Sequence, residues 1–403
     1  MPVILSYLPA AYNKIAMANT MKTLRERLRE IRNEIDSFNF IRGKSTTKDE
    51  PYDERETTSY LPQEPVIGRD REKQEIIKLL SANTNNDEIA IVPIYGLGGM
   101  GKSTLAQLVY NDAQFMKYDH RIWVYVSQDF NLNKIGSSII SQLQPEGGQQ
   151  NMCIQQVINQ CLERLLHGKK VLVVLDDLWE EKKTELDKLR RMLHIKGSKV
   201  DIIITTRKEE IARKVSTSEP YKLRPLEDDI CWEIIKRSSR FGLKSNQEQL
   251  EKIGLDIAKK CGGVALATQA IGFMLRSIDD LSGWTKINNS DIWNGSYEDN
   301  DVLPSLTLSY ERMSPQLRIC FSYCAIFPKG HNIIKVDLVE QWIALDFITE
   351  RSKGKEYIEK LIGMSFLQVS KLHLVSYNTT SLTLILTVLV LFFSIAHHSQ
   401  VLM

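Results

Sequence analysis

The chain has 403 residues, enough for about two to four domains, and its 43% hydrophobic and 25% charged residues are typical of a globular protein. This composition argues against a disordered chain, and a formal net charge of +2 gives no electrostatic footprint for nucleic acid. Six cysteines are scattered without a Cys-x-x-Cys pair, which favours reduced, mostly buried thiols in an intracellular protein.

Near the N-terminus, apolar residues recur at steps of four and three, with charged residues between them. The apolar positions are Leu24, Leu28, Ile31, Ile35 and Phe38. This spacing predicts an amphipathic helix over 14–38, either a coiled-coil seam or one helix of a bundle. Two heptads are too few to be stable alone, so this helix needs a partner face. We assign 1–42 to this helical region and the polar segment 43–65 to a linker.

A glycine-rich loop, GLGGMGKST, follows an apolar strand expected over Ile89–Tyr95. Such a loop turns successive backbone N–H groups toward phosphate oxygens at the N-terminus of a helix. Lys102 can reach the terminal phosphates, Ser103 can ligate a magnesium ion, and Thr104 can contact another phosphate. We therefore predict that the chain binds a nucleoside triphosphate or diphosphate. The residues assigned to this binding are Gly96, Gly98, Gly99, Gly101, Lys102, Ser103 and Thr104.

Further continuous apolar runs, at 121–127, 170–175 and 200–205, alternate with helical stretches. Runs of this kind are typical of parallel strands that are covered on both faces. The pattern predicts a doubly wound α/β domain over 66–220, with a helix over Asp70–Ser81 before its first strand. Beyond residue 220 the strand signal fades and helical periodicity dominates.

Two of these runs end in residues that suit nucleotide chemistry. Asp176 follows the second run and can hold magnesium beside Ser103, while Asp177 can orient or activate a water. Asp177 is shorter than the glutamate usual in motor ATPases, so we expect slow hydrolysis. Arg207 follows the third run and can bind the terminal phosphate through its planar guanidinium, although the residue alone fits a surface arginine equally well.

The order of these segments resembles the NB-ARC module of plant intracellular immune receptors, the nucleotide-binding, leucine-rich-repeat class with a coiled-coil N-terminus. The resemblance rests on eight ordered blocks in addition to the phosphate loop, of which 169–180 (KKVLVVLDDLWE) and 197–212 (GSKVDIIITTRKEEIA) are examples. The others are 57–80, 118–130, 221–241, 261–275, 320–330 and 338–348.

This resemblance implies a P-loop NTPase domain, then a helical subdomain over 221–300 and a truncated winged-helix subdomain over 301–370. It implies a cytoplasmic switch of the plant defence response, closed by ADP and opened by ATP with Mg²⁺, and at most a slow ATPase. Asp176 would serve magnesium, Asp177 hydrolysis and Arg207 the terminal phosphate. Val66, Ile67 and Arg69 would border the adenine and ribose side of the nucleotide.

Three departures from the family pattern modify these expectations. The Gly-Leu-Pro-Leu block stands as GVAL at 263–266, so Ala265 replaces a proline that packs on the adenine, and base contact should loosen modestly. The histidine of the Met-His-Asp motif has no counterpart, because His373 stands in a different context, so we expect weaker ADP retention. We also expect a truncated protein that lacks the leucine-rich repeats.

The final segment, 371–403, is hydrophobic and atypical, with an apolar stretch over 382–396. As a helix that stretch would span about 22 Å, short of the ~30 Å hydrocarbon core of a membrane. It is compatible with a membrane anchor, an aggregation-prone segment, or, as we favour, a tail outside the native coding sequence.

Two other functions compete with the switch. One is a turning-over ATPase of the AAA type, and the other is an inert or adaptor fragment that pairs with full-length receptors through the helix at 14–38.

Overall fold

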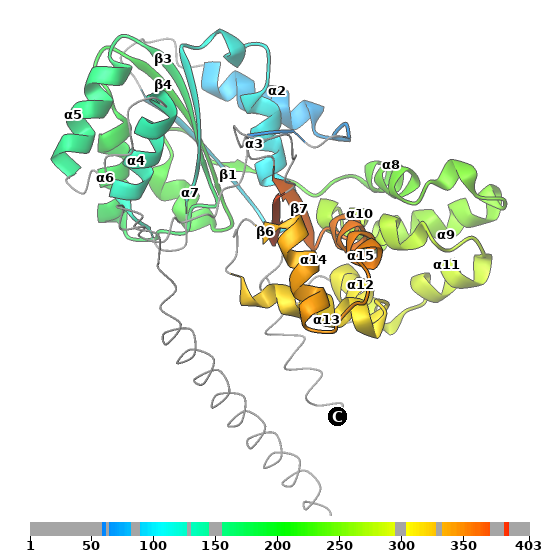
Figure 1. The fold of residues 1–403 in the computed structure, drawn as a ribbon. Helices are drawn as coiled ribbons and strands as arrows, with labels where there is room; N and C mark the ends of the chain where they lie inside the picture. Colours follow the sequence, from blue (N-terminus) through cyan, green and yellow to red (C-terminus); the bar gives the residue numbers. More distant parts are fainter. Residues whose placement is uncertain are drawn as a thin grey trace, which may run out of the picture. The chain divides into compact units, whose positions relative to one another are not determined.

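The computed structural model describes residues 59–61, 64–81, 89–126, 130–144, 155–294, 304–327, 333–370 and 383–386 (Figure 1). The helix expected over 14–38 and most of the linker lie outside these residues. His373 and residues 387–403 of the tail lie outside them too.

The first described domain is built on a five-stranded parallel sheet of strand order β2-β3-β4-β1-β5. Its strands are β1 (Ile89–Tyr95), β2 (His120–Tyr125), β3 (Lys170–Asp176), β4 (Lys199–Thr206) and β5 (Tyr221–Lys222). Strand β4 lies between β1 and β3, so Tyr95 pairs with Thr206 while Leu175 pairs with Ile204. The carboxyl ends of three strands therefore meet at one edge of the sheet, which is where ligands bind in such folds.

Helices cover both faces of this sheet, with α4, α5 and α6 on one face and α2 and α3 on the other (Figure 1). Along β3, Val171, Val173 and Leu175 enter one core, whereas Leu172 and Val174 enter the other. Burial on both faces explains the unbroken apolar run, and the predicted doubly wound fold is confirmed. The helices are α2 (Asp70–Ser81), α3 (Lys102–Tyr110), α4 (Leu132–Leu143), α5 (Gln155–Leu166), α6 (Lys183–Leu193) and α7 (Glu209–Val215).

A helical region follows the sheet. It consists of α8 (Asp228–Ser238), α9 (Gln247–Lys260), α10 (Ala265–Leu275) and α11 (Leu281–Asn288). Its core is aromatic: the rings of Trp232 and Trp284 meet edge to face with centroids 6.5 Å apart, and Phe241 lies beside both. Trp232 and Trp284 are thus core residues, as edge-to-face packing favours.

The last region combines four helices with a small antiparallel sheet of order β6-β8-β7. The helices are α12 (Pro304–Glu311), α13 (Pro315–Tyr323), α14 (Lys335–Ala344) and α15 (Arg351–Gly363), and the strands are β6 (Ile333–Ile334), β7 (Leu367–Ser370) and β8 (Thr383–Leu386). Short 3-10 turns lie at Phe115–Lys117, Phe241–Leu243, Asp291–Asn294 and Cys324–Ile326.

Two of the predicted domain boundaries fall inside sheets. Residue 370 was expected to end the winged-helix subdomain, but β8 pairs with β7 and β6 from within the supposed tail. The apolar run at 382–396 gives no sign of its pairing partner, because backbone pairing across a gap of a dozen residues leaves no local signal in the sequence. Residue 220 likewise precedes β5, the edge strand of the parallel sheet.

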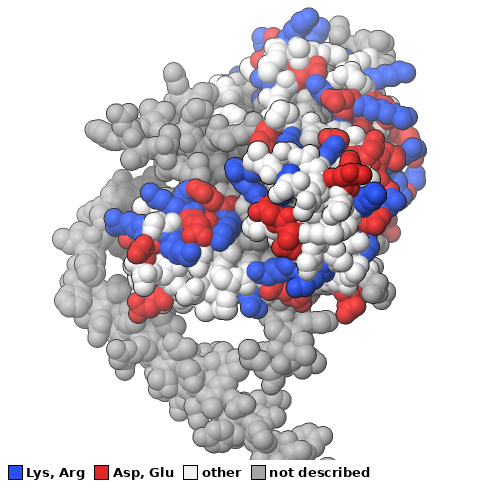
Figure 2. Space-filling model, turned by 90° about the vertical axis from the view of Figure 1, so that its right-hand side faces the viewer, with Lys and Arg blue, Asp and Glu red and all other residues white. Residues whose placement is uncertain are grey.

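Five cysteines fall in the described part of the chain, and each is a free thiol. Burial raises the pKa of Cys261 to about 12 and that of Cys320 to about 11, which keeps both thiols protonated and unreactive at neutral pH. None of the helices in the described ranges combines the length and apolar character needed to cross a membrane. On the face drawn in Figure 2, Lys and Arg intermingle with Asp and Glu.

Candidate functional site

The glycine-rich loop connects β1 to α3 at the carboxyl edge of the parallel sheet. Gly99 has a φ of 75° and Gly101, the N-cap of α3, has a φ of 94°. Residues with side chains rarely adopt these left-handed angles, whereas glycine does so without a steric penalty. The loop therefore takes its shape from its glycines, and it ends where the first turn of α3 leaves N–H groups without helical partners.

Lys102 lies inside this loop rather than in solvent. Its side chain is only 8% exposed, and its Nζ donates to the carbonyl oxygens of Gly96 at 2.9 Å and Leu97 at 2.8 Å. The ammonium group is thus held against the start of the loop, where it supplies the positive charge that phosphate oxygens require. Thr104 follows in the first turn of α3 and is partly buried.

Three side chains from separate elements converge beside Lys102. The Ser103 hydroxyl donates to Oδ1 of Asp176 at 2.8 Å, and the Thr205 hydroxyl donates to the same oxygen. Asp176 ends β3, is fully buried, and lies opposite the end of β4, which carries Thr205. A hydroxyl and a carboxylate are oxygen ligands of the kind that Mg²⁺ prefers, so the residues present fit this ion. Ser103 and Asp176 would hold it.

Asp177 and Arg207 lie at the same edge of the sheet. Asp177 has a φ of 61°, and its N–H donates to Oγ1 of Thr205 at 2.9 Å. Nε of Arg207 is 4.0 Å from Oδ1 of Asp177, and its guanidinium carbon is 5.0 Å from the ring centroid of Trp179. A Cβ atom placed on Gly98 would be only 3.3 Å from Nη1 of Arg207, so the guanidinium lies against the phosphate loop.

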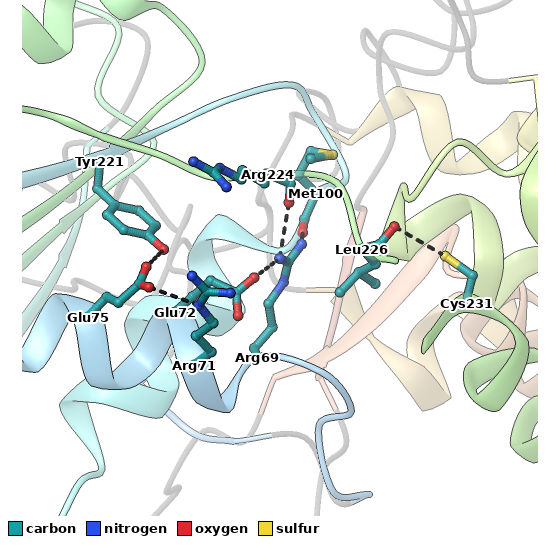
Figure 3. Close-up of polar contacts among 9 residues, drawn as sticks. All are labelled: Arg69, Arg71, Glu72, Glu75, Met100, Tyr221, Arg224, Leu226 and Cys231. Atoms are coloured by element: carbon teal, nitrogen blue, oxygen red, sulfur yellow. Dashed lines mark hydrogen bonds and ion pairs between the residues drawn. The ribbon is translucent and has the colours of Figure 1, made fainter. Parts of the chain in front are cut away.

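On its other side the loop is held through two successive carbonyl oxygens. The backbone N–H of Leu266, in the first turn of α10, donates to Gly99 O at 3.0 Å. Nη2 of Arg69 donates to Met100 O, also at 3.0 Å (Figure 3). A Cβ atom on Gly99 would be 2.9 Å from Cβ of Leu266, so a side chain at that position would not fit. Helix α10 therefore packs directly on the loop.

The predicted base-side residues lie next to this contact. Ala265 is the first residue of α10 and is partly buried in the core cluster that includes Met100. Val66 and Ile67 precede α2; both are partly buried, and Ile67 packs on the same cluster. Their contact with a base stays a prediction, whereas the guanidinium of Arg69 binds protein carbonyls.

A partly buried polar link joins α2 to β5 next to this region. Oη of Tyr221 donates to Oε2 of Glu75 at 2.6 Å, and Nε of Arg71 donates to Oε1 of the same carboxylate at 3.0 Å (Figure 3). The hydrogen bond from Tyr221, together with Arg71, lowers the pKa of Glu75. Burial, and then the Glu75 carboxylate, raises the pKa of Tyr221, so both groups keep their usual charge at neutral pH.

Two contributors to the site were not predicted. The Thr205 hydroxyl donates to the carboxylate of Asp176 and accepts from the backbone N–H of Asp177, and Trp179 contacts Arg207. The signal for Thr205 was a hydroxyl at the end of a buried strand beside Arg207. Only its nearness to Asp176 in the sequence could have indicated a role for Trp179, because the ring follows β3 whereas the Arg207 that it contacts follows β4.

A phosphate loop after β1, a buried acid at the end of β3 and a parallel sheet covered on both faces define a P-loop nucleotide-binding domain. Comparison with known families matches residues 69–241 to the NB-ARC domain and residues 326–383 to the disease resistance protein winged helix domain. The chain therefore belongs to the NB-ARC family, and it carries both domains.

Its relatives include plant disease resistance proteins. Disease resistance protein RGA2 of Solanum bulbocastanum is 35% identical over 324 residues, which are 78% of this chain and 33% of that protein. Putative disease resistance RPP13-like protein 1 of Arabidopsis thaliana is 33% identical over 338 residues, 80% of this chain and 32% of that protein. The chain thus spans about a third of the length of these relatives. A signal transduction ATPase with numerous domains from Pyrococcus horikoshii aligns with a TM-score of 0.49 and 14% identity, covering 82% of this chain and 42% of that chain.

Proposed function

We propose that the chain is an adenine-nucleotide switch of plant innate immunity, closed when it binds ADP and opened by exchange for ATP. The observation that carries this proposal is the hydrogen bond between Gly99 O of the phosphate loop and Leu266 N–H of α10. Through it, the loop that would grip the phosphates is attached to the first turn of a helix in the next region. A change of the bound nucleotide would therefore also affect helix α10, outside the parallel sheet.

The side chains at the sheet edge have distinct roles in this proposal. Lys102 and the N–H groups of the loop would hold the phosphates, and Ser103 and Asp176 would hold Mg²⁺, which would neutralise phosphate charge. We assign to Arg207 the contact with a terminal phosphate that ATP has and ADP lacks, and its position against Gly98 supports this assignment. The adenine preference and the cytoplasmic location follow from the resemblance and are part of the proposal.

Hydrolysis by this site should be slow. Asp177 is the residue that we assign to orient a water, but its carboxylate lies 4.0 Å from Nε of Arg207. That cation competes with a water for the same carboxylate, which weakens it as a base. Pairing with full-length receptors through the helix at 14–38, or self-association, remains a further part of the proposal that rests on the sequence alone.

The first test is nucleotide binding by the full chain. Added ADP should bind, and extensive dialysis should remove it, because the histidine expected to contact ADP has no counterpart here. Lys102→Ala should weaken ADP binding by on the order of 100-fold, since a charged donor inside the loop is lost. Binding is measured by calorimetry, and the released nucleotide is identified by chromatography after denaturation.

The matched control is Lys188→Ala, which removes an exposed lysine that pairs with Glu185 on α6. It should bind ADP as the unaltered chain does. Equal ADP binding by the Lys102→Ala variant would contradict the proposal, and so would no binding by the folded, unaltered chain. Sustained multiple-turnover hydrolysis would favour the AAA-type ATPase instead.

A further inference from the structure

The guanidinium of Arg69 connects three segments that are far apart in the sequence. Its Nη2 donates to Met100 O in the phosphate loop at 3.0 Å, and its Nη1 donates to Arg224 O at 3.1 Å (Figure 3). Nη1 also pairs with the carboxylate of Glu72 on α2. The side chain is 4% exposed, so these contacts are shielded from water. We propose that Arg69 is a positioning residue that couples the phosphate loop to the linker 223–227, which leads into α8.

The first consequence concerns the phosphate-binding N–H groups. In a trans peptide the C=O and the following N–H point in opposite directions, so a fixed carbonyl fixes the next N–H. Arg69 holds Met100 O, which orients the N–H of Gly101, and Leu266 holds Gly99 O, which orients the N–H of Met100. Arg69 therefore acts on the phosphates through the backbone of the loop.

The second consequence concerns the linker. Leu223 N–H donates to Tyr95 O at 2.8 Å, and Leu226 N–H donates to Gly263 O at 2.9 Å. The linker thus runs from the edge of the sheet to the turn before α10, and Arg69 binds it between these two bonds. Displacement of the helical region would move Arg224 O and release one of the carbonyls that Arg69 holds.

Only an arginine suits this position. The guanidinium is planar and offers five N–H donors in a fixed fork, so it can hold two carbonyls and a carboxylate at once. A lysine has its donors on one nitrogen and cannot span both carbonyls in the same geometry. The sequence-based expectation instead places Arg69 beside the adenine and ribose. In that case the loss of Arg69 would weaken ADP binding but not the binding of pyrophosphate, which has no base.

The inference rests on the proposed nucleotide binding, and its test separates the two. The full chain, Arg69→Met and Arg71→Met are compared for affinity to ADP and to inorganic pyrophosphate, by displacement of a fluorescent ADP analogue. Arg71 is the matched control because its side chain is 84% exposed and pairs with Glu75 rather than with the loop. Arg69→Met should weaken both ligands by the same factor, about tenfold or more, and Arg71→Met should leave both unchanged.

Hydrogen exchange provides the second measurement. Saturating ADP should slow amide exchange across 223–227 in the full chain and in Arg71→Met, but not in Arg69→Met. Circular dichroism shows whether each variant is folded. If Arg69→Met does not fold, Arg69→Lys takes its place, with a smaller but again equal loss for the two ligands.

A loss for ADP without a loss for pyrophosphate would place Arg69 at the base and overturn the inference, while leaving the proposed function intact. Unchanged affinities, or unchanged ADP protection of the linker, would overturn it as well. Failure of the folded, unaltered chain to bind ADP overturns the proposed function and the inference together.

Discussion

The two sides of the phosphate loop are built from different kinds of contact. On the metal side, the side chains of Ser103, Asp176 and Thr205 meet at the ends of strands that are buried on both faces. On the helix side, backbone carbonyls of Gly99 and Met100 accept from segments before and after the sheet. The first arrangement holds the side chains to which we assign the chemistry. The second joins segments that are far apart in the sequence, so we expect a switch to act on this side.

The metal side can be broken by removing its carboxylate. Asp176→Asn should weaken Mg²⁺-dependent ATP binding by on the order of 100-fold, because it removes the proposed carboxylate ligand. Thr205→Val should weaken it by about 10-fold, because the Thr205 hydroxyl binds Asp176 and would orient it toward the metal. Titration with Mg²⁺ and with EDTA measures the effect. In EDTA the variants should approach the unaltered chain, since the metal contribution is then absent from all of them. An undiminished response of Asp176→Asn to Mg²⁺ would rule out this metal site.

The helix side can be broken with one methyl group. Gly99→Ala and Gly101→Ala both place a side chain at a positive φ, of 75° and 94°, which costs roughly 1–3 kcal/mol each. Only at Gly99 does the new Cβ meet a neighbour, Leu266, whereas at Gly101 nothing lies within 4 Å. Thermal unfolding without nucleotide should therefore shift further for Gly99→Ala. Equal shifts would show that the packing of α10 on the loop adds nothing to stability.

Trp179 allows a smaller change on the metal side. Trp179→Leu removes the ring beside the Arg207 guanidinium, an interaction worth about 1 kcal/mol. If the ring holds Arg207 against the loop, ATP affinity should fall about fivefold while ADP affinity stays unchanged. Trp179→Phe should retain most of the ATP affinity. Parallel losses for ATP and ADP would mean that the ring acts on the whole site and not through Arg207.

Asp201 is a buried carboxyl outside the nucleotide site, so its replacement tests the stability of the sheet apart from binding. It is a fully buried carboxyl on β4 that accepts from Oη of Tyr118 at 2.6 Å, and burial raises its pKa. A raised folded-state pKa penalises the fold once the group ionises, so this penalty is absent at low pH and appears as pH rises through that pKa. Asp201→Asn should therefore raise the unfolding temperature by a few degrees at pH 7 and by less near pH 4.

The same variant is a control for Asp176→Asn, because both replace a buried carboxyl in one sheet. Nucleotide affinity should be unchanged in Asp201→Asn. A larger stabilisation at pH 4 than at pH 7 would contradict the assignment of the raised pKa.

Much of the nucleotide site is readable from the sequence. The loop glycines, Lys102, Ser103 and Asp176 are specified by residue type and by their place after an apolar strand, and the structure brings them together. Strand β1 and helix α2 have the predicted bounds, and the other predicted strands differ by a residue or two at their ends. These features are local, because a strand that is buried on both faces has a continuous apolar sequence.

What the tertiary structure alone decided is which distant segments touch the loop. Nothing in the sequence around Arg69 distinguishes a guanidinium that contacts a nucleotide from one that holds Met100 O and Arg224 O. Thr205 and Leu266 likewise join the site through strand order and helix placement, and β8 completes its sheet from the supposed tail. A backbone carbonyl accepts hydrogen bonds in every residue, so the sequence does not mark which distant side chain or N–H will bind it, and such contacts appear only when the chain has folded.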